Sequence, residues 1–162
     1  SFIADCKIRY YADISKDNFA PSLGRRSIRL ENTHAAAIGW LNEKGKIEFG
    51  CGGSLILESF VLTAAHCMDN PNTLERPLIV RLGDRNLKNS KDYEYAQQIK
   101  IRQIIPHPNY NSATSHFDIA LLVLDKPARI NFGVIPACLW LDDELPISTL
   151  YAAGWGANGF GK

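Results

Sequence analysis

The chain has 162 residues, of which 46% are hydrophobic and 22% are charged. These proportions exclude a disordered chain and are typical of one globular domain. The 18 Lys and Arg residues nearly balance the 17 Asp and Glu residues, so no overall field favours nucleic acid or an anionic membrane as a partner. The apolar runs are too short to cross a bilayer. Residues 1–5 lack the pattern of a signal peptide, so a leader was either removed or never present.

Short apolar runs separated by turn residues predict strands from Ala35 onward, after a mixed, polar and extended segment over 1–34. Ala64–Cys67 can form one helical turn, and Pro106–Tyr110 predicts a turn because proline fixes φ and removes a donor. Many short strands of this kind indicate an all-β sandwich or barrel. The expected strands cover residues 36–41, 47–49, 54–57, 60–63, 78–82, 93–105, 119–124 and 151–156.

The four cysteines contain no C-x-x-C pair, which argues against a zinc ribbon and against a thioredoxin-like redox motif. Four cysteines allow three pairings. Cys51 and Cys67 flank a hairpin-like stretch and form the easiest local pair, which leaves Cys6 with Cys138. Two disulfides would imply an oxidising compartment. Four buried free thiols in a cytosolic protein are the alternative that the residues leave open.

Two segments carry a family resemblance. The letters CGGSLI and VLTAAHC, within Cys51–Cys67, resemble the catalytic-histidine block of trypsin-like serine proteases. Phe117–Leu122, which reads FDIALL, resembles the catalytic-aspartate block of that family. Weaker matches follow the family's order at residues 107–110, 136–139 and 153–156. The resemblance runs from about residue 35 to the last residue and is nearest to arthropod clip-domain-type proteases and their homologues.

This resemblance implies a trypsin-like Greek-key β-barrel over residues 35–135. Residues 1–34 would be a propeptide-like segment, and 136–162 would be the inter-barrel linker with the first strand of an incomplete second barrel. His66 would be the general base, and Asp118 would fix the tautomer and orientation of its ring.

The family's cysteine pattern implies a bridge between Cys51 and Cys67 and a second between Cys6 and Cys138. With this resemblance, the chain is expected to be secreted and extracellular, and to belong to a protein of the zymogen type.

Two departures from the family pattern bear on activity. The nucleophile block Gly-Asp-Ser-Gly-Gly is absent, so this chain alone cannot carry out acyl transfer. The usual Ile-Val-Gly-Gly start would fall near residues 21–24, which read PSLG and follow Ala20 rather than a basic residue. Ordinary zymogen activation is therefore not expected there.

The last residues also bear on chain organisation. Lys162 falls where the family has a cleavage-prone loop, which predicts a nick and a second chain carrying the remainder.

Two functions from different classes follow. The first is the chain of a secreted serine endopeptidase that carries His66 and Asp118, is completed by a second, nicked chain, and acts on protein substrates. The alternative is a non-catalytic protease homologue that acts as a binding protein, decoy or cofactor in an extracellular cascade. Retention of both motif residues favours the first, and the missing activation start favours the second.

No cofactor, metal, nucleic acid or membrane partner is expected. Gly154-x-Gly156-x-x-Gly159 fits a dinucleotide fingerprint by its letters, but no helix pattern follows it. The loop near residues 82–89 offers one carboxylate, Asp84, which is too few for calcium. His107 is expected to be a turn residue, His116 an exposed loop residue, and Ser54 a structural position in a strand.

Overall fold

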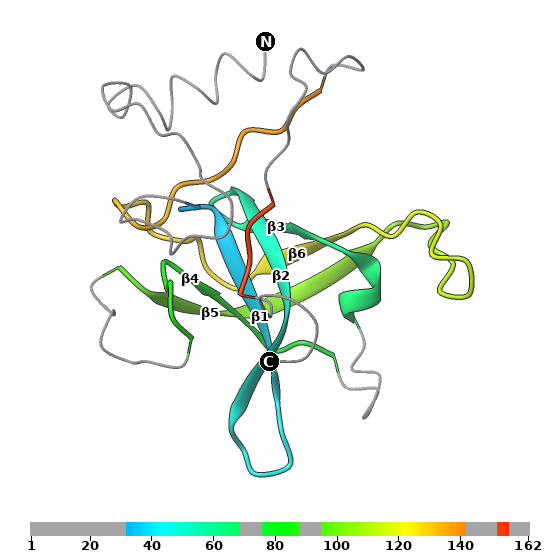
Figure 1. Cartoon of the computed structure of the whole chain (residues 1–162), viewed down its shortest axis with the longest axis horizontal. Coiled ribbons are helices and arrows are strands. Elements are labelled where there is room, and N and C mark those ends of the chain that lie inside the picture. The colour runs from blue at the N-terminus through cyan, green and yellow to red at the C-terminus, as the bar shows by residue number, and fades with distance from the viewer. Residues whose placement is uncertain (1–31, 69–75, 88–94, 142–151, 156–162) are drawn as a thin grey trace.

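The structure is a computed structural model that describes residues 32–68, 76–87, 95–141 and 152–155. Its strands form one closed barrel in the order β1-β2-β3-β6-β5-β4 (Figure 1). Every neighbouring pair is antiparallel. The chain continues from β3 to β4, but β4 pairs with β1 and β5 whereas β3 pairs with β6, so this connection is of the Greek-key type. The predicted all-β barrel is therefore confirmed. The elements are β1 (Ala35–Leu41), β2 (Ile47–Leu57), β3 (Phe60–Thr63), the 3-10 helix η1 (Ala65–Met68), β4 (Ile79–Leu82), β5 (Gln97–Pro106) and β6 (Ala120–Leu124).

Two strand predictions differ from the structure. The separate strands expected over 47–49 and 54–57 are one strand, β2, which continues through the glycines between them. Gly52 and Gly53 pair with Ala37 and Ala36 of β1, and this pairing holds them extended despite the low strand propensity of glycine. Ala152–Trp155, the described part of the strand expected over 151–156, is not in a strand. No described strand lies beside it to complete its backbone hydrogen bonds.

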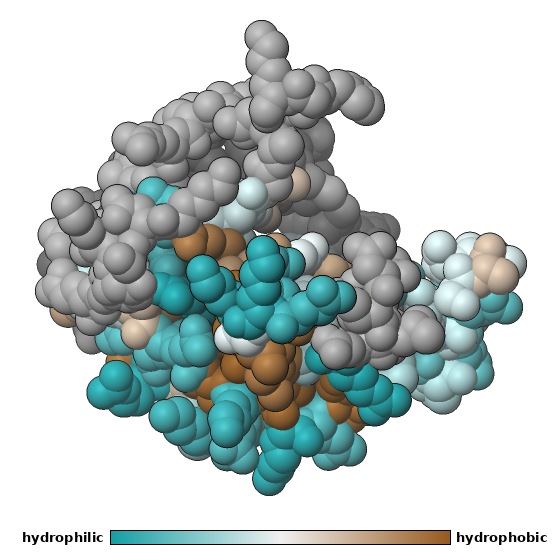
Figure 2. All heavy atoms as spheres, turned by 90° about the horizontal axis from the view of Figure 1, so that it is seen from below, coloured by the Kyte–Doolittle hydropathy of each residue, from teal (hydrophilic) through white to brown (hydrophobic). Residues whose placement is uncertain are grey.

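The barrel interior is filled by aliphatic side chains from every strand. Antiparallel closure leaves no free sheet edge among the barrel strands, so their backbone groups are paired while these side chains pack inward. Figure 2 views the barrel from the end of the β1–β2 hairpin and shows mostly hydrophilic side chains with apolar ones between them. The side chains that are 0–2% exposed include Ile38, Leu55, Val61, Val80, Leu82, Ile99 and Leu122.

The chain after β6 returns along the barrel toward β2. Its backbone N–H groups donate to carbonyls of earlier segments, as in the bonds from Ala128 to Glu58 (2.7 Å) and from Ala137 to Leu55 (2.7 Å). The buried side chain of Gln97 bonds both backbone groups of Arg129, at 2.6 and 2.8 Å. This course brings Cys138 to the barrel surface in a disulfide-bonded state. Its expected partner Cys6 lies outside the described residues.

Gly53 is a point of close approach between β2 and β3. A Cβ added there would lie 2.8 Å from the Leu62 carbonyl oxygen and 2.8 Å from Val61 Cγ1. The neighbouring Gly52 is different, because a Cβ there would meet only the Ala36 carbonyl oxygen, at 3.9 Å. Only a glycine at position 53 therefore lets the two strands pair at the observed spacing.

We expect Gly53→Ala to lower the free energy of unfolding by about 1–3 kcal/mol, since the new methyl group must push the β3 backbone outward. Gly52→Ala is the matched control and should cost less, since its methyl group enters ordinary contact distance. Urea denaturation of the two variants and the parent chain measures the difference. Equal stability of the two variants would contradict the close approach.

Candidate active site

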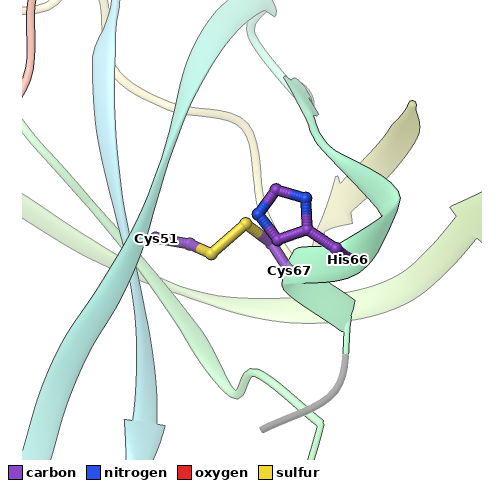
Figure 3. A group of neighbouring side chains, drawn as sticks. All are labelled: Cys51, His66 and Cys67. Carbon is purple, nitrogen blue, oxygen red and sulfur yellow. A yellow bond between two sulfur atoms is a disulfide. The ribbon is translucent and has the colours of Figure 1, made fainter. Parts of the chain in front are cut away.

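His66 lies in the short helix η1, which follows directly from the end of β3. Two contacts attach this turn to β2. The Thr63 hydroxyl donates to the Gly52 carbonyl oxygen at 2.8 Å. Cys67 forms a disulfide with Cys51, and Figure 3 shows the His66 ring beside this bridge. The predicted local pairing of these two cysteines is confirmed, and it holds the histidine-bearing turn against the barrel wall.

Asp118 lies just before β6, which is the neighbour of β3 in the barrel. The register pairs Thr63 with Ala120, so the residues after β3 and those before β6 emerge at the same end of the barrel. His66 and Asp118 are 52 positions apart in the sequence, but the strand pairing brings them into contact. The structure therefore brings together the two residues that the motifs singled out.

Asp118 uses both carboxylate oxygens on His66. The His66 backbone N–H donates to Oδ1 at 2.8 Å, and the ring Nδ1 lies 2.7 Å from Oδ2. An ionised carboxylate can only accept, so the ring proton is on Nδ1. The other ring nitrogen, Nε2, then carries the free lone pair. Because the His66 side chain is 63% exposed, that lone pair is open to a further reacting group.

These hydrogen bonds also set the charge state of the aspartate. The bond from the His66 ring, followed by the one from the His66 backbone, lowers the pKa of Asp118 below its ordinary value. Both bonds favour the charged carboxylate, whereas partial desolvation opposes it. Asp118 is therefore ionised at neutral pH and able to hold the imidazole in one tautomer.

The described residues offer one geometric cluster of potential metal ligands, which comprises Cys51, His66 and Cys67. The two sulfur atoms are bonded to each other, so neither is a thiolate that could bind a metal. Asp84 is also engaged, because Arg81 Nε lies 2.6 Å from Oδ2 and the Asn86 backbone N–H donates to Oδ1 at 2.9 Å. Neither group has the free ligands that a cation would require.

The other singled-out residues take the places expected of them. Ser54 lies in β2 with backbone partners on both sides, and His116 is exposed in the loop before Asp118. His107 lies in the predicted turn, but its ring also stacks on Phe117 with centroids 4.8 Å apart. The sequence interpretation missed this contact. The position of Phe117, next to the motif aspartate, was the available signal.

Asp118→Asn tests the electrostatic link between the two residues. A carboxyl with a lowered pKa stabilises the fold fully above its unfolded pKa of about 4, and that contribution is lost as pH falls through the lower folded value. We expect the parent chain to lose stability over this acidic range and Asp118→Asn to show a shallower loss. Urea denaturation from pH 7 down to pH 2 measures both. Identical pH profiles would show that the carboxylate is not stabilised by His66.

Comparison with known proteins agrees with this geometry. The family model described as Trypsin matches residues 29–162. Serine protease snk of Drosophila melanogaster is 44% identical over 131 residues, which are 78% of this chain and 29% of that protein. Vitamin K-dependent protein C of Oryctolagus cuniculus is 42% identical over 109 residues, 67% of this chain and 22% of that protein. The chain thus spans less than a third of the length of these curated relatives.

Solved structures agree on the fold. The structure titled "Structure of GrC" has a TM-score of 0.61 and 32% identity, over 74% of this chain and 49% of that one. The Drosophila Grass clip serine protease of the Toll pathway has a TM-score of 0.62 over 84% of this chain and 42% of that one. At 24% identity, the likeness to Grass supports the fold alone. Because the family match includes every described strand, the chain belongs to the trypsin-like serine protease family.

Proposed function

We propose that this chain supplies the general base and its orienting carboxylate to a secreted serine endopeptidase. The observation that carries the proposal is the two-point contact of Asp118 with His66, at 2.7 and 2.8 Å. In this arrangement Nε2 accepts a proton from a nucleophile, and Asp118 stabilises the imidazolium that forms. The proton later passes from Nε2 to the leaving amine.

The serine of this mechanism is not among the 162 residues. We infer that it is supplied by further polypeptide of the same catalytic domain, together with the backbone amides that stabilise the oxyanion. The exposed ring of His66 supports this, because its Nε2 can reach a group outside the first barrel.

The proposed location is extracellular. The Cys51–Cys67 disulfide supports an oxidising compartment. Cys138 is also disulfide-bonded, which supports the proposed bridge to Cys6. In this arrangement the N-terminal segment is tethered covalently to the linker, as a propeptide would be. The substrates are proteins, in keeping with the family.

A non-catalytic homologue is the second candidate, and one observation favours it. Residues 21–24 read PSLG where the family's activated chain begins with Ile-Val-Gly-Gly. A protein without that start cannot form the usual new N-terminus, and would act by binding in an extracellular cascade. The His66–Asp118 contact favours the catalytic proposal, because a binding role does not require an ionised carboxylate on the imidazole.

The first test is the intact mass of the purified native protein, measured under native and then under denaturing, non-reducing conditions. We expect a co-purifying polypeptide that contains Gly-Asp-Ser-Gly and whose serine reacts with a fluorophosphonate.

The second test is the rate of peptide hydrolysis. Because hydrolysis requires the general base, His66→Ala should reduce peptide hydrolysis by the complete domain on the order of 10⁴-fold or more. Asp118→Asn should reduce kcat about 10⁴-fold, because the amide favours the wrong tautomer.

His116→Ala is the matched control, because it removes an exposed histidine from the loop before Asp118 and should leave hydrolysis unchanged. A single 18.0 kDa species under both mass conditions, with no fluorophosphonate label, would overturn the catalytic proposal. That result would favour the binding role.

A further inference from the structure

We propose that His107 and Phe117 position Asp118 against His66, through a ring stack that holds the backbone on which the carboxylate is mounted. We refer to these two residues as the His107–Phe117 clamp. Neither ring touches the reacting atoms, so both are positioning residues. The inference rests on the proposed function, in which the Asp118–His66 contact is the working part of the site.

The clamp begins with the ring contact. The imidazole of His107 and the phenyl ring of Phe117 lie with centroids 4.8 Å apart and planes 7° from parallel. Phe117 is 55% exposed, so burial in the core does not hold its ring in place. The stack on His107 therefore fixes the direction of a side chain that is otherwise largely in solvent, one residue before Asp118.

The backbone of Phe117 is unusual. Its φ is 55°, in the left-handed region that bulky residues rarely adopt. Its carbonyl oxygen accepts a hydrogen bond from the Ile119 N–H at 2.7 Å, which closes a three-residue turn centred on Asp118. Such a conformation persists only where surrounding contacts enforce it, and the ring stack is one such contact.

His107 holds the other side of the same turn. Its backbone N–H donates to the Ile119 carbonyl oxygen at 2.9 Å. His107 therefore contacts the residue before Asp118 through its ring and the residue after it through its backbone. The Asn109 backbone N–H donates to His107 Nδ1 at 3.1 Å, and the Tyr110 N–H donates to the His107 carbonyl oxygen at 2.9 Å. The clamp is thus anchored within its own turn.

Asp118 requires this control because its two oxygens must meet two donors at once. One is the ring Nδ1–H of His66 and the other is its backbone N–H, at 2.7 and 2.8 Å. A rotation of the turn that keeps one bond would lengthen the other. The clamp limits that rotation, since it fixes the chain directions both entering and leaving Asp118.

Phe117→Leu, Phe117→Gly and Phe117→Tyr in the full chain separate the ring from the backbone. Leucine removes the stack and keeps apolar bulk, glycine removes the stack and relieves the left-handed strain, and tyrosine keeps the stack. NMR supplies two readouts, namely the downfield signal of the His66 Nδ1 proton and the pH titration of the Asp118 carboxyl carbon. We expect Leu and Gly to weaken the proton signal and to raise the pKa of Asp118 toward its ordinary value, and Tyr to retain both.

Phe132→Leu is the matched control, because Phe132 is 68% exposed and lies outside the turn. It should leave both readouts unchanged. Unchanged readouts in Phe117→Leu would overturn the clamp. If Phe117→Leu changes both readouts but Phe117→Gly changes neither, the backbone conformation of residue 117 and not the ring stack positions Asp118, and the clamp is also overturned. If Phe117→Leu fails to fold, His107→Phe against His107→Leu repeats the comparison, since phenylalanine preserves the stack. Because neither readout depends on turnover, failure of the catalytic proposal leaves this test intact.

Discussion

The antiparallel pairing of β3 with β6 is the constraint on which the candidate site depends. It runs from Phe60 opposite Val123 to Thr63 opposite Ala120, so the end of one strand and the start of the other coincide. His66 and Asp118 are separated by 52 positions, and bringing such distant residues together costs loop-closure entropy. Burial of the barrel interior offsets that cost. The two polar residues therefore meet as a consequence of the core, and their own hydrogen bonds determine only the final geometry.

The geometry of that contact is chemically specific. A single hydrogen bond would leave the imidazole free to rotate about its bond to the chain. Asp118 binds the ring with one oxygen and the backbone of the same residue with the other, so ring and chain are held relative to each other. The ionised state of the carboxylate requires the proton on Nδ1, and Nε2 is consequently the basic nitrogen. Position, tautomer and charge all follow from one side chain.

The sequence predicted the main features of both fold and site. Apolar and alternating runs located all six barrel strands, and the resemblance of two blocks to those of trypsin-like serine proteases identified the contacting pair. The prediction failed where neighbours decide the conformation. Gly52 and Gly53 are poor strand formers, yet their pairing with Ala37 and Ala36 of β1 keeps them in one strand. The stack of His107 on Phe117 depends on a turn whose left-handed residue is an aromatic, and no local preference favours that conformation.

The first three residues of the histidine block, Cys51, Gly52 and Gly53, each have a structural role near His66. Three consecutive residues of β2 each hold a different part of the segment that carries His66. Cys51 bonds the turn through Cys67, the Gly52 carbonyl accepts from the Thr63 hydroxyl, and Gly53 lets the β3 backbone approach at Leu62. A larger residue at the third position would displace β3, and with it the turn that follows. Residues 51–53 thus fix the position of the segment that carries His66. The turn at Asp118 must then place its carboxylate where it can reach the ring and the backbone N–H of a histidine held in that position.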